Sequence, residues 1–256
     1  MGIAFLALLI YFLISKKQFE KSIKKISIFI LVGVIVGIHW ATFFQALKVS
    51  NVSVTLTTLA SASFFVSFLE PLFYRRRIIW YEVFFGLLVI FGLYLIFSFE
   101  AEYKLGIILA LCSAFTAALF SVINGRLIQK SKAGQITMYE MLGGVIGISI
   151  YTLLFENVEV GAFSPSFLDI FYLLILGIIC TAVAFVVSIE VMKVLSPYTV
   201  SISINMEPIY AIILALIFFG ESEKMTIGFY FGAALILSTV IGNGVLKHVF
   251  KKRKAS

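Results

Sequence analysis

The chain has 256 residues, of which 61% are hydrophobic and 13% are charged, and its formal net charge is +7. Soluble globular domains contain about 25% charged residues, so this composition excludes an ordinary soluble protein and predicts a chain that crosses a membrane several times. The positive charge follows the loops between apolar runs, so we interpret it as a signal of membrane topology and expect no nucleic-acid partner.

Apolar runs of about 20 residues alternate with short polar segments along the chain, and as helices they are long enough to cross a hydrocarbon core about 30 Å thick. The expected spans are 27–47, 52–73, 79–98, 104–125, 136–155, 168–190, 197–219 and 225–246. A further apolar run, Met1–Ile14, reaches only about 21 Å at 1.5 Å per residue. We interpret this run as the end of a helix whose beginning is absent. Together with the eight spans it makes nine segments.

Basic residues divide the loops into two alternating sets. One set contains 17 of the 20 Lys and Arg residues, including the basic tail 247–256, and the other set collects most of the acidic residues. Cytoplasmic loops carry the excess of Lys and Arg. The first set is therefore predicted to be cytoplasmic, with the C-terminus on that side of the cell membrane.

The sequence repeats weakly when it is aligned with itself at an offset of 146. The alignment runs without a gap from Lys48 to Gly86, and it pairs Ser50 with Ser196 and Val54 with Val200. The second copy has five spans, an odd number, so equivalent helices are expected to run in opposite directions. An inverted repeat of this kind is typical of transporters, whose substrate site lies near the membrane midplane between the repeats. We expect repeats at 1–98 and 104–246.

The span 197–219 carries Glu207 and Asn205 near its midpoint, with Pro208 directly after the carboxylate. A charged residue at that depth costs roughly 2.5–3.5 kcal/mol, so such residues usually face protein or water and have a function. Proline removes a backbone N–H and crowds the preceding turn, so we expect a kink here. Positions i, i+4 and i+8 share a helix face. One face therefore combines Thr199, Ser203 and Glu207, and Tyr210 extends it.

The repeat places a second polar stripe opposite the first. Ser53, Thr57 and Ser61 align with Thr199, Ser203 and Glu207. Two crossing helices with matched stripes would line a water-accessible cavity that binds substrate. Two alternatives stay open: the hydroxyls pack between helices and bond to backbone carbonyls, and Glu207 is a neutral acid that holds the kink.

A third group of candidate substrate-binding residues lies on two other spans. These residues are His39, Trp40, Thr42 and Phe43 on the span 27–47, with Phe185 and Ser188 as repeat mates of His39 and Thr42. A histidine there could titrate near neutral pH, and the aromatic rings could form a wall for an amphipathic or cationic solute. A neutral histidine bonded to a carbonyl, and plain aromatic packing, are the alternatives.

Glycines four residues apart occur in three spans, at Gly33/Gly37, Gly143/Gly147 and Gly228/Gly232. Small residues at this spacing allow helix backbones to approach closely. We therefore expect close helix contacts at these three places.

The order and spacing of several segments carry a family resemblance. In the second repeat these are S-I-E-V-M-K-V-L-S-P-Y-T-V-S-I from Ser188, E-P-I-Y-A at Glu207 and F-F-G-E at Phe218, and in the first repeat Q-A-L-K-V-S at Gln45 and F-L-E-P-L-F at Phe68. The chain resembles the EamA domain of drug/metabolite transporters. The resemblance implies an all-α integral membrane protein with ten helices in two inverted five-helix bundles, of which the first helix is missing here. It also implies a central cavity between the third, fourth, eighth and ninth helices.

The resemblance implies a secondary transporter, and specifically an exporter of a small metabolite such as an amino acid or a derivative, which works by alternating access. We expect a small-molecule substrate and the lipid bilayer as partners, a proton as the candidate coupling ion, and no cofactor; a homodimer stays open. The rival functions are a truncated, non-transporting membrane protein and a membrane-embedded enzyme. Against the enzyme, the chain has no H-E-x-x-H or G-x-S-x-G motif, and its one Asp excludes a paired-aspartate site.

Overall fold

The computed structural model describes residues 1–75, 77, 80–155, 165–204, 207–220 and 225–253. These residues form helices and contain no strand, as predicted for an all-α protein. The chain divides into two compact units, and each combines two separate stretches of sequence. Unit 1 consists of residues 1–41 and 123–195, and unit 2 consists of residues 42–122 and 196–256.

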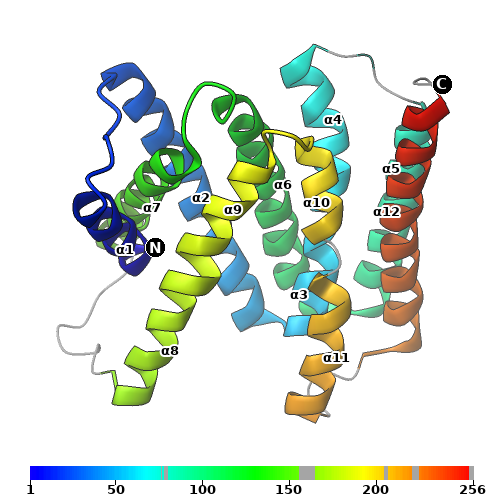
Figure 1. The fold of residues 1–256 in the computed structure, drawn as a ribbon. Coiled ribbons are helices and arrows are strands. Elements are labelled where there is room, and N and C mark those ends of the chain that lie inside the picture. Colours follow the sequence, from blue (N-terminus) through cyan, green and yellow to red (C-terminus); the bar gives the residue numbers. More distant parts are fainter. Residues whose placement is uncertain (76, 78–79, 156–164, 205–206, 221–224, 254–256) are drawn as a thin grey trace. The chain divides into compact units, whose positions relative to one another are not determined.

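Unit 1 is organised around α7 (Ala133–Phe155), which packs against α1 (Gly2–Ile14) and against α9 (Ala184–Val191). Figure 1 shows α1 and α7 together, with the first part of α2 (Ile23–Val49) beside them. The end of α6 (Lys104–Leu127) completes this unit together with α8 (Phe167–Gly177) and the π-helical turn η2 (Ile178–Val183).

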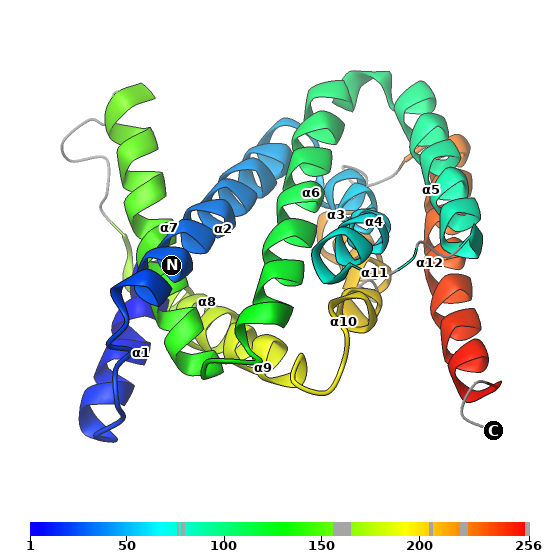
Figure 2. The same cartoon turned by 90° about the horizontal axis from the view of Figure 1, so that it is seen from above.

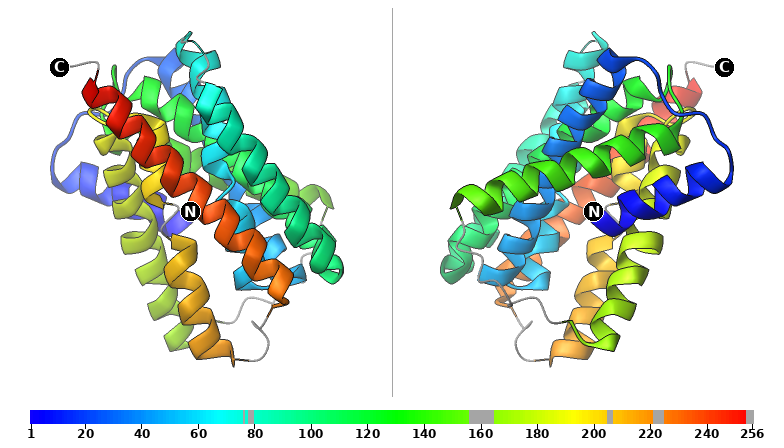
Figure 3. Two further views of the ribbon diagram at one scale, coloured as in Figure 1. Left: turned by 90° about the vertical axis from the view of Figure 1, so that its right-hand side faces the viewer. Right: turned by 90° about the vertical axis from the view of Figure 1, so that its left-hand side faces the viewer.

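Glycines bring α2 and α7 into backbone contact within unit 1, as the spacing predicted. A Cβ atom at Gly33 would lie 2.2 Å from the backbone oxygen of Glu140, and one at Gly143 would lie 2.2 Å from that of Ile30. No side chain fits at either position, because real Cβ atoms do not approach backbone so closely. The crossing of these two helices is visible in the right-hand view of Figure 3.

The span predicted at 168–190 forms as α8, η2 and α9, with a wide turn in its middle. Ser166 and Asp169 begin it with a reciprocal capping box, in which each side chain accepts a backbone N–H bond from the other residue. In η2 the Thr181 hydroxyl donates to the carbonyl of Leu176 at 2.7 Å. Turns of this kind are inserted into α-helices and are common at functional sites. The sequence pattern did not predict this one.

Unit 2 contains a pair of long helices, α5 (Trp80–Phe99) and α12 (Ile227–Arg253). They lie side by side in Figure 2 and in the left-hand view of Figure 3. A short 3₁₀ turn, η1 (Ala101–Tyr103), joins α5 to α6. Glycines again allow the close approach: a Cβ at Gly232 would lie 2.7 Å from the oxygen of Gly92, and one at Gly228 would overlap the ring of Phe99. All three predicted glycine pairs therefore make close contacts.

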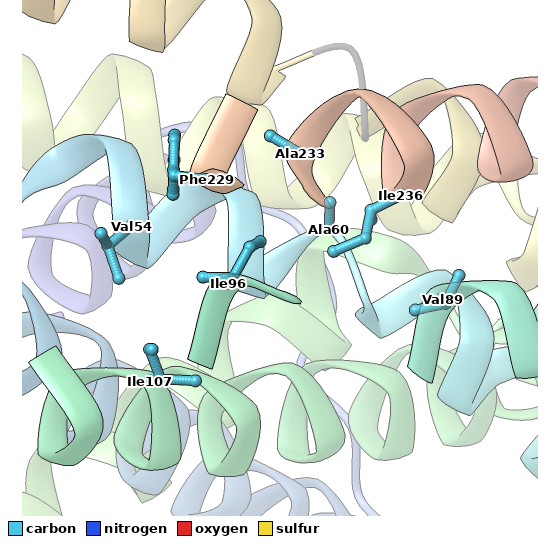
Figure 4. Packing of buried hydrophobic residues seen from close by; sticks show 8 residues of the cluster. All are labelled: Val54, Ala60, Val89, Ile96, Ile107, Phe229, Ala233 and Ile236. Carbon is cyan, nitrogen blue, oxygen red and sulfur yellow. The ribbon is translucent and has the colours of Figure 1, made fainter. Parts of the chain in front are cut away.

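A buried hydrophobic cluster holds the α5–α12 pair against its neighbours. Its members are Val54, Ala60, Val89, Ile96, Ile107, Phe229, Ala233 and Ile236, shown in Figure 4. Glu100 fixes the start of α12 from the end of α5, because its carboxylate accepts hydrogen bonds from the backbone N–H of Thr226 at 2.9 Å and from its hydroxyl at 2.7 Å.

The described helices match the predicted membrane spans. Five are long and apolar enough to cross a bilayer, and four shorter apolar helices are also present. The five spans are Ile23–Val49, Val52–Tyr74, Lys104–Leu127, Ala133–Leu153 and Phe167–Val191. This is a multi-pass membrane protein, and its nine predicted segments correspond to these nine regions.

Candidate functional site

Two pairs of consecutive helices in unit 2 carry the predicted polar stripes. The first pair is α3 (Val52–Leu59) with α4 (Ala62–Tyr74), and the second is α10 (Pro197–Ile204) with α11 (Glu207–Phe219). Shifted by 146 residues, the outer ends of the two pairs coincide to within about one residue. α3 packs against α11 and α4 packs against α10. The two helix pairs therefore run antiparallel, as an inverted repeat requires.

The α3–α4 interruption forms without a proline. Asn51 begins α3 by accepting the N–H of Val54 at 2.9 Å with its side-chain oxygen. At the break, the N–H of Ser61 donates to the oxygen of Thr58 at 3.1 Å, a tighter i to i+3 bond. The apolar run 52–73 predicts one continuous helix, because no proline or glycine marks residues 60 and 61.

The stripe on the α3 side is buried. The side chains of Thr57 and Ser61 are fully inaccessible, and their hydroxyl oxygens have no hydrogen-bond partner; the same holds for Thr58. Ser53 is also fully buried. Buried hydroxyls without partners cost about 1–3 kcal/mol each, so their retention calls for an explanation.

The stripe on the α10–α11 side is exposed. Thr199, Ser203, Glu207 and Tyr210 are all exposed. The single face predicted for them stays a prediction, because residues 205 and 206, which link α10 to α11, lie outside the described residues. The Ser203 hydroxyl donates to the carbonyl of Thr199 at 3.2 Å, and the Thr199 hydroxyl lies 3.0 Å from that of Ser196. Asn205 lies outside the described residues, and α11 begins at Glu207, directly after that gap. The kink predicted at Pro208 therefore stays a prediction.

A carboxylate outside the predicted polar stripes joins the two helix pairs. Glu70, in the F-L-E-P-L-F segment at Phe68, is buried, and its Oε2 accepts the backbone N–H of Tyr198 at 3.1 Å. That N–H lies at the start of α10, where helix donors need a partner. Glu70 therefore ties α4 to the helix that bears the exposed stripe. The recurring Glu-Pro pair, at 70 and at 207, was the available signal.

The remaining predicted site residues divide between the two units. His39 and Trp40 on α2, and Phe185 and Ser188 on α9, are half-buried residues of unit 1. Thr42 and Phe43, at the following turn of α2, belong to unit 2. The Phe43 ring packs edge-on against Phe44, with centroids 5.3 Å apart. Their role in binding stays a prediction.

The described residues contain no group of three or more His, Cys, Asp or Glu side chains that could hold a metal ion. What unit 2 offers in this region is a carboxylate and hydroxyls on an apolar helix. Such groups bind and orient a small polar molecule by hydrogen bonds and charge.

Comparisons with known proteins bear on the fold and on the family. A crystal structure of another protein superimposes with a TM-score of 0.66 over 97% of this chain and 85% of the other, at 14% identity, which shows a shared fold. An uncharacterised transporter from Archaeoglobus fulgidus is 29% identical over 150 residues, which are 59% of this chain and 52% of the relative. The chain thus matches about half the length of that transporter.

The sequence pattern of the EamA-like transporter family matches residues 1–98 and 104–244, nearly the whole chain. The resemblance found in the sequence motifs is thereby confirmed, together with the helical membrane fold that it implies. The chain belongs to the EamA-like transporter family.

Proposed function

We propose that this protein is a secondary transporter that exports a small metabolite, such as an amino acid or a derivative, by alternating access. The observation that carries the proposal is the exposure of four polar residues, Thr199, Ser203, Glu207 and Tyr210, on the apolar helices α10 and α11. Polar groups on a membrane helix are expensive unless they meet water, protein or a polar ligand. Family membership supports transport in general.

Glu207 is the proposed centre of the site. It is the first described residue of α11 and lies near the middle of the predicted span 197–219, where a carboxylate is expensive unless it meets water, protein or a polar ligand. From there it binds either a proton that drives transport or a cationic part of the substrate. Ser203 and Thr199, four and eight residues before Glu207 and on its face by helical periodicity, supply hydrogen bonds to the substrate in this proposal.

Comparative metabolomics identifies the substrate. The extracellular medium of cells that produce the protein is compared with that of cells producing a Glu207→Gln variant at equal abundance. Export predicts metabolites that accumulate outside the cells only with the parent protein. Equal profiles for the parent, the variant and cells without the protein would contradict transport of any detected metabolite.

Transport in proteoliposomes then separates the two roles of Glu207. If the carboxylate couples transport to protons, Glu207→Gln abolishes pH-driven accumulation and keeps downhill exchange. If it binds a cationic substrate, the variant loses affinity at every pH. A variant that behaves as the parent does from pH 5 to 8 would leave Glu207 without either role.

The proposed location is the cell membrane, with the C-terminus in the cytoplasm. The distribution of Lys and Arg supports this orientation. Single cysteines near Lys21 and Lys130 should be shielded from an impermeant thiol reagent in intact cells, and a cysteine near Glu159 should react. Cys112 and Cys180 are free and exposed, so both are first replaced by serine. Labelling in the opposite pattern would reverse the orientation.

A further inference from the structure

A carboxyl group and a carboxamide meet inside unit 1, away from the exposed stripe. Glu140 is the eighth residue of α7, about 10 Å along the helix from Ala133, and Asn124 lies near the end of α6. Their exposed fractions are 0% and 1%. The Asn124 side-chain nitrogen donates to Glu140 Oε2 at 3.2 Å.

Each side chain has one oxygen left over. Glu140 Oε1 and Asn124 Oδ1 are both buried and have no hydrogen-bond partner. An ionised carboxylate and a carboxamide oxygen both only accept hydrogen bonds, so neither can satisfy the other. Reversing the carboxamide would not help, because its oxygen would then face Glu140 Oε2. One hydrogen between Glu140 Oε1 and Asn124 Oδ1 would satisfy both oxygens.

The neighbouring elements offer Glu140 little compensating charge. The titratable or charged groups on the elements that contact α7 or Glu140, and on α7 itself near Glu140, are the Met1 amino group before α1, Tyr11 of α1, Lys24, Lys25, His39 and Lys48 of α2, Lys104 and Arg126 of α6, Tyr139 of α7 and Glu190 of α9. Tyr11, Arg126 and Glu190 are exposed, and Lys25 and Glu190 form ion pairs with Glu20 and Lys193. Measured along α2 from Gly33, which contacts Glu140, Lys25 lies about 12 Å away and His39 about 9 Å away.

We propose that Glu140 and Asn124 form a proton-binding site. The proton comes from water and adds to Glu140 Oε1, which neutralises the carboxylate without any other bond change. The new O–H then donates to Asn124 Oδ1, while the Asn124 amide donates to Glu140 Oε2. Both leftover oxygens are satisfied by this single proton, and a buried unpaired charge, which proteins avoid, is removed.

The number of available oxygens favours a proton over a larger cation. In this pair of side chains, Glu140 Oε1 and Asn124 Oδ1 are the two oxygens without a partner. A sodium ion needs several oxygen ligands around it and space for itself. A proton needs only the two oxygens that are already present.

Infrared difference spectroscopy of the purified full chain tests the site directly. A protonated carboxyl group has a C=O stretch that a carboxylate lacks, so the parent at pH 7 minus Glu140→Gln should show that band. Glu207→Gln, the matched control, should keep it. The carboxamide introduced by Glu140→Gln can make the same two hydrogen bonds with Asn124, so the variant should fold normally. A parent without the band, or a band unchanged in Glu140→Gln, would overturn the proposal.

The pH dependence of stability gives a second readout. At neutral pH an acid exposed by unfolding is ionised, so a folded state that holds this proton releases it on unfolding. Stability then decreases as pH rises, by up to about a tenfold change in the unfolding equilibrium constant per pH unit while the site stays protonated. Glu140→Gln should remove that slope. A slope that persists in the variant contradicts the proposal, and so does an increase in parent stability with sodium concentration, which would identify the ligand as sodium.

Discussion

The two helix pairs of unit 2, α3–α4 and α10–α11, have equivalent positions in the repeat but opposite surroundings. In the α3–α4 segment the side chains of Thr57 and Ser61 are fully buried, whereas on α10 and α11 Ser203 and Glu207 are exposed. One polar stripe therefore lies in the interior of the unit and the other polar residues lie on its outside.

The difference in burial indicates which of the two helix pairs could bind a ligand. A charge at the α3 position would be enclosed by protein without a counter-charge, and this copy has Ser61 there. The other copy has Glu207, which is exposed on unit 2. We therefore propose that the α10–α11 residues bind the ligand and that the α3–α4 stripe packs inside the unit.

The largest loss of folded protein is expected when a carboxylate is introduced into the buried α3–α4 stripe. Ser61→Glu places a carboxylate in a fully buried position at a cost of about 3 kcal/mol or more, so most of the protein should fail to fold. Ser203→Glu, the matched change on the exposed face, should leave at least half of the folded yield. Size-exclusion chromatography in detergent measures that yield. An equal loss for Ser203→Glu would mean that this face contacts lipid.

A smaller loss of stability is expected when the hydrogen bond between Glu70 and the Tyr198 N–H is removed. Glu70→Met keeps the size of the side chain and removes the acceptor of the Tyr198 N–H, which leaves a buried donor at a cost of about 1–3 kcal/mol. Glu70→Gln, which keeps an acceptor, should cost less. The melting temperature of each purified variant measures the loss, and a Glu70→Met protein as stable as the parent would contradict the link.

Removing an unpartnered hydroxyl from the buried stripe should be harmless or stabilising. Thr57→Val preserves the side-chain shape and removes an oxygen without a partner, so we expect a gain of up to about 1 kcal/mol. Transport per folded molecule should not change. Loss of transport at normal stability would show that the Thr57 hydroxyl meets a ligand after all.

The smallest effects are expected at the ends of the two copies. α4 ends at Arg75 with φ +52°, and α11 is followed by Gly220 with φ +58°. Only glycine adopts this left-handed region freely, so Arg75→Gly should stabilise by about 1 kcal/mol and Gly220→Ala should destabilise by about as much. Thermal unfolding measures both changes, and shifts of the same sign would contradict the explanation.

The fold was largely predictable because hydrophobic length and charge act locally. Spans can be delimited by counting apolar residues, and the glycine pairs mark close contacts because only glycine leaves room for a backbone. The interruption at Ala60 and Ser61 and the π-turn at Ile178–Val183 were not predictable in this way. Neither contains a proline, and both depend on how neighbouring helices pack.

The candidate site was predictable only in part. The face shared by Thr199, Ser203 and Glu207 follows from helical periodicity, but periodicity does not tell a buried stripe from an exposed one. Glu70 and Glu140 were missed for a related reason: their partners, Tyr198 and Asn124, are 128 and 16 residues away in the sequence. Helix pairing, which sequence spacing does not specify, brings these groups together.

The interleaving of the two units sets the order in which the chain can be assembled during synthesis. Residues 1–41 of unit 1 precede the whole of 42–122, which belongs to unit 2. The glycine face of α2 therefore enters the membrane long before α7, its partner, is translated. With about 110 residues between Gly33 and Gly143, a ribosome making 5–20 residues per second needs roughly 5–20 s to supply that partner. During this interval the bare backbone stripe of α2 must be covered by lipid or by the insertion machinery.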